Sequence, residues 1–185
     1  AAAKRHGLTV SYDPNYRPSV WQGRGGWQRA RETDLRLAAH ADVIVGALGL
    51  AGTGPDGPRL GAADVPEAFA EIAELLPGAT VLATTLRRVV TAGVNDWSSA
   101  AWSRETGCVQ GPEMPGQHVL DRIGSGDGFA AGLIYGLMTG ADLARALAYG
   151  TVHGALAMTT PGDTSMASLA DVEALMATAS SSVRR

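Results

Sequence analysis

The sequence is poor in lysine and cysteine, and each shortage excludes a class of chemistry. Lys4 is the only lysine among 185 residues, which excludes a GxxxxGK[ST] phosphate-binding loop and argues against a Schiff-base lysine. Cys108 is the only cysteine, which excludes an internal disulfide and a cysteine-rich zinc site. No apolar run reaches the roughly 20 residues of a transmembrane helix, and no secretion signal opens the chain. We therefore expect a cytoplasmic protein without a membrane partner.

Charge and hydropathy indicate a globular domain. The 15 basic and 18 acidic residues give a formal net charge of −3, so the chain lacks the basic field that drives nucleic-acid binding. We expect no nucleic-acid partner. Apolar residues make up 45% of the chain and the mean hydropathy is +0.03, which is enough for the core of one domain.

Strand and helix patterns alternate along the chain, as is typical of an α/β fold with a parallel sheet covered on both faces. The predicted strands cover residues 8–13, 43–45, 80–86 and 118–123, with short β segments around residues 94, 102 and 109. The predicted helices cover residues 1–6, 27–40, 64–76, 142–158 and 168–176, and one more runs from the turn at 124–127 to Gly140. Residues 13–26 and 46–62 are predicted loops, the second of them flexible and rich in Gly and Pro.

The strongest local signal is the turn Gly124-Ser125-Gly126-Asp127, which joins a predicted strand to an apolar helix. Glycines let backbone N–H groups approach a ligand closely, and a helix N-terminus adds partial positive charge, so a phosphate would fit here. The same charge favours the ionised carboxylate of Asp127, which can then accept a proton from an attacking hydroxyl as a general base. Taken alone, the pattern is as typical of a tight turn with a helix cap as it is of a phosphate-binding site.

The segment from Asp121 to Leu133 resembles the C-terminal signature of the PfkB or ribokinase-like sugar kinases. The resemblance implies a ribokinase-like three-layer α/β sandwich with a mostly parallel central sheet, and ATP and Mg²⁺ as cofactors. It implies that the amides of Gly124, Ser125 and Gly126 form an anion hole for the γ-phosphate and that Asp127 deprotonates the sugar. It also implies a monovalent-cation site, for K⁺, at Asp121. Arg122 departs from the small residue or Thr that is commonest at its position.

A second segment, Asp13-Pro14-Asn15-Tyr16-Arg17, resembles the D-x-N-x-R segment of the 2-keto-3-deoxygluconate kinase branch of this family. The planar guanidinium of Arg17 matches a carboxylate with two parallel hydrogen bonds, so the resemblance implies that Arg17 binds a sugar acid. Without the family, Asp13, Asn15 and Arg17 are equally typical of a proline-rich loop that holds itself together.

Further matches to the same branch lie at residues 84–87, 95–97, 153–158 and 161–163. These matches and the match at the turn imply that several residues contact the nucleotide. They are Thr85, Arg87, Gly124, Gly126, Gly154, Ala157 and Gly162. His153 is predicted to be an ordinary helix histidine. The predicted function is ATP-dependent phosphorylation of a sugar-acid hydroxyl, converting 2-keto-3-deoxygluconate to its 6-phosphate.

The chain departs from the family pattern in two places. The family's Asn-x-x-Glu motif, which helps to organise Mg²⁺ and phosphate, would follow the strand at 43–45, but Gly46-Ala47-Leu48-Gly49 stands there. We expect a few residues to be missing from this loop. The N-terminal half and its β lid, through which a homo-oligomer would form, are also lacking by analogy with the family. Residues 1–185 would then be the C-terminal, nucleotide-binding and catalytic part of one ribokinase-like domain, and we expect the isolated chain to be poorly soluble or inactive.

Three alternatives remain open. The chain could be another PfkB sugar kinase of the ribokinase or fructokinase type, or a non-catalytic, degenerate kinase fragment. The glycines from Gly46 to Gly52 also suggest a dinucleotide-binding turn, although their spacing is GxxGxxG instead of GxGxxG, and Pro55 and Pro58 oppose the helix that must follow.

Overall fold

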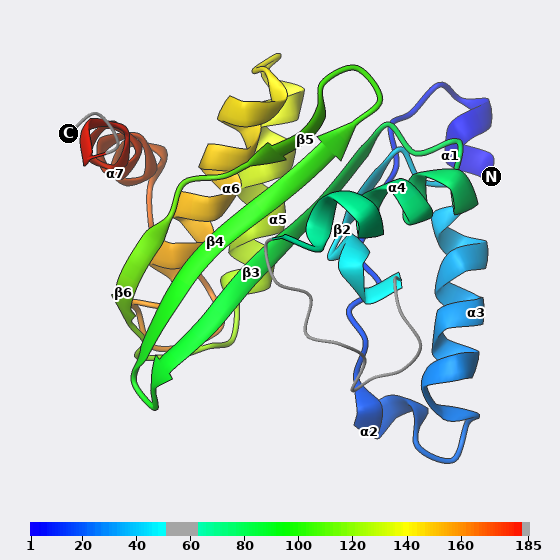
Figure 1. Cartoon of the computed structure of the whole chain (residues 1–185), viewed down its shortest axis with the longest axis horizontal. Helices are drawn as coiled ribbons and strands as arrows, with labels where there is room; N and C mark the ends of the chain where they lie inside the picture. The colour runs from blue at the N-terminus through cyan, green and yellow to red at the C-terminus, as the bar shows by residue number, and fades with distance from the viewer. Residues whose placement is uncertain (51–62, 183–185) are drawn as a thin grey trace. The chain divides into compact units, whose positions relative to one another are not determined.

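The computed structural model describes residues 1–50 and 63–182. They form two compact units: an N-terminal unit of residues 1–84 and 102–108, and a C-terminal unit of residues 85–101 and 109 onward. The strands follow the order β1-β2-β3-β4-β5, with β6 paired to β4 (Figure 1). The long strands β3 (Val81–Thr91) and β4 (Val94–Ser103) and the short strand β5 (Gly107–Gln110) contribute residues to both units. The expected α/β fold is confirmed.

Parallel strands form the centre of the N-terminal unit. Its remaining elements are, in chain order, α1 (Ala2–Arg5), β1 (Ser11–Tyr12), α2 (Pro18–Trp21), α3 (Gly26–Ala38), β2 (Val43–Val45), the short 3₁₀ helix η1 (Ala47–Leu50) and α4 (Val65–Leu75). Residue Ile44 pairs with Tyr12 of β1 on one side and with Leu82 of β3 on the other. All three residues of β2 are buried, as expected for a central parallel strand covered on both faces.

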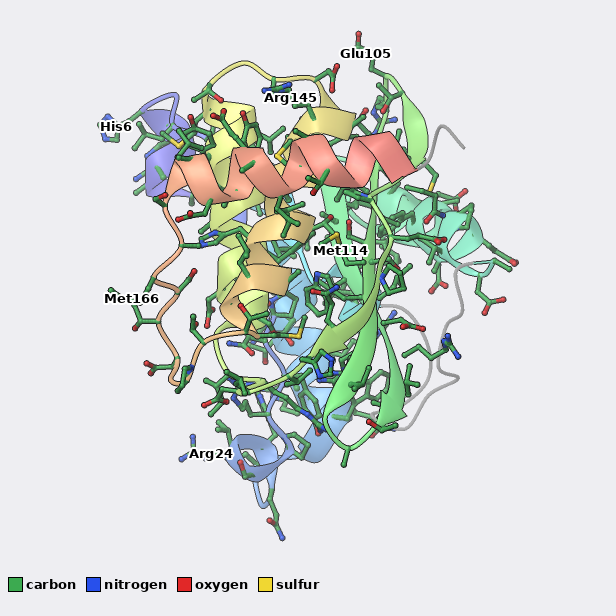
Figure 2. The ribbon with its side chains drawn as sticks, turned by 90° about the vertical axis from the view of Figure 1, so that its left-hand side faces the viewer. His6, Arg24, Glu105, Met114, Arg145 and Met166 are labelled. Atoms are coloured by element: carbon green, nitrogen blue, oxygen red, sulfur yellow. The ribbon has the colours of Figure 1, made fainter. Side chains whose placement is uncertain are left out.

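The C-terminal unit combines antiparallel strands with three helices. It adds β6 (Met114–His118), α5 (Ser125–Met138), α6 (Leu143–Ala157) and α7 (Leu169–Ser182). Small residues let α5 and α6 approach closely, since a Cβ on Gly132 would lie 2.4 Å from the carbonyl oxygen of Tyr149. At the start of α6, Arg145 (Figure 2) donates to the Tyr149 hydroxyl, which donates to Glu173 of α7 at 2.9 Å. The core of this unit is therefore a close helix pair with α7 bonded to it.

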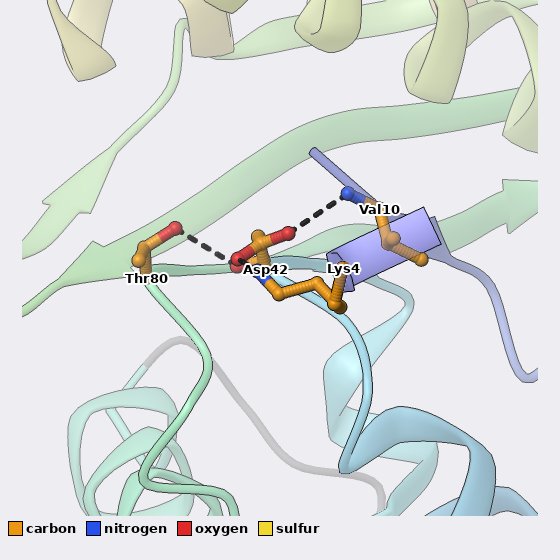
Figure 3. Close-up of polar contacts among 4 residues, drawn as sticks. All are labelled: Lys4, Val10, Asp42 and Thr80. Carbon is orange, nitrogen blue, oxygen red and sulfur yellow. Dashed lines mark hydrogen bonds and ion pairs between the residues drawn. The ribbon is translucent and has the colours of Figure 1, made fainter. Parts of the chain in front are cut away.

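Asp42 connects the amino ends of the parallel strands in the N-terminal unit (Figure 3). Its carboxylate accepts a hydrogen bond from Val10 N at 2.8 Å and pairs with Lys4, and its carbonyl oxygen accepts one from Thr80 Oγ1 at 3.0 Å. The hydrogen bond from Lys4, followed by that from Val10, lowers the pKa of Asp42 below its usual value. The carboxyl ends of these strands lie at the opposite edge of the sheet, which is the edge where α/β proteins bind their ligands.

The predicted helices are confirmed, but several strand predictions are wrong. The strand at 8–13 is reduced to β1, and α2 lies inside the predicted loop 13–26. The β segments predicted around residues 94 and 102 belong to one long strand, β4, whereas the segment predicted around residue 109 is confirmed as β5. The sheet is mixed, because β6 runs antiparallel to β4. The predicted strand 118–123 does not form: Leu120 N donates to Met158 O at 2.9 Å, which takes the chain out of the sheet toward the end of α6. Of the predicted loop 46–62, residues 51–62 lie outside the described residues.

Candidate active site

The start of α5 presents unused backbone donors. Gly124 is the N-cap residue, and the first hydrogen bond of the helix runs from Gly128 N to Gly124 O at 2.7 Å. The N–H groups of Ser125, Gly126 and Asp127 come before that bond, so they have no carbonyl partner within the helix. A glycine N-cap has no side chain that could cap them. Gly124, whose amide the family resemblance also assigns to the anion hole, is the N-cap residue, and its role as a donor stays a prediction. Three donors and the positive end of the helix dipole thus gather at one place, which is the arrangement that binds an anion.

The residues of this turn differ in exposure. Gly126 and Asp127 are exposed, and a Cβ added to Gly126 would meet no atom within 4 Å. Ser125 is buried, and its hydroxyl donates to Arg122 O at 3.0 Å. At Gly124, where φ is +83°, a Cβ would lie only 2.4 Å from the carbonyl oxygen of Asp163. The turn is therefore packed on its Gly124 side and open at Gly126 and Asp127.

Asp121 stands just before the turn, and its carboxylate is bonded to backbone N–H groups. Its Oδ1 accepts a hydrogen bond from Ile123 N at 3.0 Å. That bond is the main reason why the pKa of Asp121 lies below its usual value, and the N–H groups of Gly162 and Arg122 act in the same direction. The hydrogen bond from Ile123 N therefore fixes the Asp121 side chain against the backbone just before the turn.

The described side chains do not assemble a metal site. Within residues 1–50 and 63–182, no group of three or more His, Cys, Asp or Glu side chains could hold a metal ion. Asp121 Oδ1 accepts a hydrogen bond from Ile123 N, and a role of Asp121 toward K⁺ stays a prediction. Mg²⁺ commonly reaches kinase sites on the nucleotide phosphates, with water completing its shell.

Two of the predicted nucleotide contacts have a packing role. Gly154 and Ala157 are buried on α6, and a Cβ on Gly154 would lie 2.8 Å from Ser125 O and 2.9 Å from the Trp97 ring. The Trp97 indole N–H in turn donates to Thr151 O at 3.0 Å. Gly154 thus allows α6, α5 and β4 to pack closely, and contact of Gly154 or Ala157 with a nucleotide stays a prediction.

The other predicted nucleotide contacts lie at more accessible positions. Gly162 is exposed in the loop after α6, with φ at +97° and no atom within 4 Å of an added Cβ. Thr85 is half-buried and Arg87 is exposed, both on β3. His153 donates to or accepts from the Ser165 hydroxyl at 3.0 Å, which agrees with its prediction as an ordinary helix histidine.

Arg17 lies in the N-terminal unit, in the loop that follows β1. It occupies the N-cap position of α2, its side chain is exposed, and it forms no ion pair with an acidic side chain in the described part of the chain. Asp13 shapes the loop by accepting a hydrogen bond from Asn15 N at 2.9 Å, and Asn15 has a positive φ of 43°. The loop is therefore stabilised by a hydrogen bond of its own, as expected for a proline-rich loop without reference to any family. It still presents the Arg17 guanidinium to solvent.

One anchor of this loop was not foreseen from the sequence. The Tyr12 hydroxyl donates to Asp34 Oδ1 at 2.7 Å, and Asp34 is buried on α3. Burial, followed by the hydrogen bond to Asp34, raises the pKa of Tyr12 well above its usual value. The polar residue at position 34 within an apolar helix face was the available signal.

The dinucleotide-binding alternative does not agree with the structure. A Rossmann turn requires a long helix directly after the glycines, but Gly46 is followed by η1, a 3₁₀ helix of four residues. Of this segment, residues 51 and 52 lie outside the described part of the chain.

These features define an α/β protein in which the turn at the start of α5 carries backbone donors without helix partners, as an anion-binding turn requires. The chain belongs to the pfkB family of carbohydrate kinases, whose sequence profile matches residues 1–169. It is 30% identical over 157 residues to 2-dehydro-3-deoxygluconokinase of Bacillus subtilis (strain 168), a match that covers 85% of this chain and 43% of the relative. None of the helices described here is both long enough and apolar enough to cross a bilayer.

Solved structures show the same fold. The 2-dehydro-3-deoxygluconokinase of Thermotoga maritima superimposes with a TM-score of 0.81 at 26% identity, over 95% of this chain and 53% of that one. An E. coli protein solved in complex with ATP and Mg²⁺ has a TM-score of 0.67 at 22% identity, over 95% of this chain and 50% of that one. The chain thus spans about half the length of these relatives. The expected ribokinase-like α/β fold is confirmed.

Proposed function

We propose that this protein transfers the γ-phosphoryl group of ATP to a hydroxyl of a sugar acid, and that the sugar acid is 2-keto-3-deoxygluconate, which becomes its 6-phosphate. The observation that carries the proposal is the start of α5, where three amides without helix partners stand beside the exposed carboxylate of Asp127. Membership of a carbohydrate kinase family supports the reaction. The relative from B. subtilis, whose name specifies this compound under its synonym 2-dehydro-3-deoxygluconate, supports the substrate.

In the proposed reaction, the carboxylate of Asp127 takes the proton from the sugar hydroxyl as its oxygen attacks the γ-phosphorus. A bond forms between that oxygen and phosphorus, and the bond from phosphorus to the oxygen bridging to the β-phosphate breaks, so ADP leaves. The N–H groups of Ser125, Gly126 and Asp127 stabilise the charge on the transferring group. Asp127 then returns the proton to solvent. Mg²⁺, when bound together with ATP, would neutralise part of the phosphate charge.

Arg17 supports a sugar acid over a neutral sugar. Its guanidinium is exposed and has no ion-pair partner in the described residues. A guanidinium forms charge-assisted hydrogen bonds with a carboxylate, and a neutral sugar has no group that requires them.

The test is an ADP-release assay on the full-length protein with a panel of 2-keto-3-deoxygluconate, ribose and fructose, combined with calorimetric titration of ATP. Asp127→Asn should lower kcat about 10²- to 10⁴-fold and leave the affinity for ATP within a few-fold. Asp142→Asn is the matched control. It removes one carboxylate from the N-cap of α6, where the Asp142 side chain accepts from Arg145 N at 2.7 Å, and asparagine caps a helix equally well.

Each of the other outcomes has a definite meaning. Near wild-type turnover by Asp127→Asn would refute the assignment of the general base. Phosphorylation of ribose or fructose in preference to the sugar acid would favour the ribokinase or fructokinase alternative. A folded full-length protein that phosphorylates no sugar would favour the non-catalytic alternative.

A further inference from the structure

His153 stands where three parts of the C-terminal unit meet. It lies on α6, and its carbonyl oxygen would be 3.3 Å from a Cβ added to Gly128, in the first turn of α5. Its imidazole Nε2 lies 3.0 Å from the hydroxyl of Ser165, in the segment of residues 158–168 that follows α6. His153 therefore contacts the start of α5 with its backbone and the segment after α6 with its side chain.

The segment of residues 158–168 packs against the anion-binding turn, residues 124–127. A Cβ added to Gly124 would be 2.4 Å from the carbonyl oxygen of Asp163, two residues before Ser165. Gly124 is the N-cap of α5, and its carbonyl oxygen accepts the first bond of that helix, from Gly128 N at 2.7 Å. The position of Asp163 therefore limits where the N-cap of α5 can lie.

The Ser165 hydroxyl joins the imidazole of His153 to the backbone of the segment. It lies 3.0 Å from His153 Nε2 and accepts a hydrogen bond from Ala167 N at 3.3 Å. A hydroxyl has one donor and two acceptor positions, so it can bond to both partners at once with either tautomer of the imidazole. Residues 158–168 belong to no helix or strand, so side-chain bonds of this kind contribute to holding their course.

We propose that His153 is a positioning residue for the anion-binding turn. Through Ser165, it holds residues 158–168 against Gly124, so that the three N–H groups without helix partners at the start of α5 point to one place. This inference rests on the proposed function for the identity of the anion, a transferring phosphoryl group. It gives His153 a role beyond that of an ordinary helix histidine, and the role requires no contact between His153 and a nucleotide.

The first test follows backbone hydrogen exchange in the full-length protein, resolved by NMR, and needs no catalytic activity. His153→Leu should speed exchange of the Gly128 amide about tenfold, because an N-cap that is held less firmly lets the first bond of α5 open more often. His153→Gln, whose side-chain amide can still bond to the Ser165 hydroxyl, should recover most of the slow exchange. The Ala146 amide makes the equivalent first bond of α6, to Asp142 O at 2.9 Å, and its exchange should not change.

Ser165→Ala removes the other partner of the same bond. Ser165→Ala alone, and combined with His153→Leu, should speed exchange at Gly128 as much as His153→Leu does, because the second substitution has no bond left to remove. Thr139→Ala is the matched control. It removes a hydroxyl that donates to Tyr135 O at 2.9 Å at the far end of α5, and it should leave exchange at Gly128 unchanged. Additive effects of the two substitutions would overturn the inference.

The second test separates positioning from nucleotide binding by the steady-state kinetics of the full-length protein. His153→Leu should lower kcat about tenfold with KM for ATP nearly unchanged, and His153→Gln should recover most of the loss. A residue that positions the turn affects the stabilisation of the transferring group, whereas a residue that binds the nucleotide affects KM. A tenfold rise in KM for ATP with unchanged kcat would overturn the inference in favour of a nucleotide contact.

The two tests also separate this inference from the proposed function. Unchanged exchange at Gly128 in His153→Leu overturns the positioning role even if the wild-type protein is an active kinase. Faster exchange at Gly128 in a full-length protein that phosphorylates no sugar supports the positioning of the turn and overturns the proposed function. If His153→Leu does not fold, Ser165→Ala replaces it as the variant without the bond, and the same outcomes decide.

Discussion

Replacing Gly124 by alanine should destabilise the C-terminal unit, because this position requires glycine for two separate reasons. Its φ of +83° lies in the left-handed region, which costs a residue with a Cβ about 1–2 kcal/mol. The added Cβ would lie 2.4 Å from the carbonyl oxygen of Asp163, so the backbone must move by about 1 Å to reach ordinary contact, and such overpacking costs about 1–3 kcal/mol. Together the two effects predict a loss of about 2–5 kcal/mol in the free energy of unfolding.

Gly126 offers a matched substitution two residues further on. Its φ is not positive, and an added Cβ would meet no atom within 4 Å. Gly126→Ala should therefore leave the free energy of unfolding unchanged or raise it by up to about 1 kcal/mol, since alanine favours the helix. The new methyl group nevertheless enters the space in which the proposed phosphoryl group would lie, so phosphoryl transfer should fall.

The measurement is urea unfolding followed by circular dichroism without nucleotide, paired with the ADP-release assay. Gly124→Ala should lose stability and activity together, and Gly126→Ala should lose activity alone. Equal unfolding midpoints for Gly124→Ala and the wild-type protein would refute the close approach to Asp163. A loss of more than about 1 kcal/mol in Gly126→Ala would refute the open position, because substitutions at open surface sites usually stay within ~0.5 kcal/mol.

Two further predictions concern the N-terminal unit. Arg17→Ala should raise KM for sugar acids about 10- to 100-fold, which corresponds to the loss of a charge-assisted hydrogen bond, and should leave KM for neutral sugars unchanged. Steady-state kinetics that show an equal rise in KM for both kinds of sugar would contradict the role of Arg17 in binding a carboxylate. Because bonds from Lys4 and Val10 lower the pKa of Asp42, its carboxylate stabilises the fold at neutral pH, and this contribution disappears as pH falls from about 4 through the lowered value. Urea unfolding should therefore give a lower free energy of unfolding for Asp42→Asn than for the wild-type protein at pH 7, and a much smaller difference at the lowest pH at which both proteins fold. The same difference at the two pH values would contradict this prediction.

The α-helices other than α2 could be predicted from the sequence because their signals are local. Asp142 caps α6 by accepting from Arg145 N. Ser168 and Asp171 form reciprocal bonds at the start of α7. Each signal lies within four residues of the helix end that it defines, so no knowledge of distant contacts is needed.

The strands were harder to predict because pairing between distant residues decides them. Residues 87–91 of β3 are all exposed, so they lack the alternation of buried and exposed positions that marks a strand. The apolar residues Leu120 and Ile123 suggested a strand at 118–123, but they are 67% and 63% exposed. Apolar character predicts a strand only where the fold buries it.

The same difference between local and long-range signals decides which parts of the candidate site could be predicted. The residues of the anion-binding turn are adjacent in sequence, so their composition alone predicts exposed donors at a helix start. The sequence does not distinguish the tasks of the two glycines, since that depends on Asp163, 39 residues beyond Gly124. Gly124 is required by the packing of its own unit, whereas Gly126 leaves open space. A loss of activity in a Gly124 variant is therefore no evidence for a ligand. Only a loss of activity in a Gly126 or Asp127 variant of unchanged stability would show that a ligand binds at the turn.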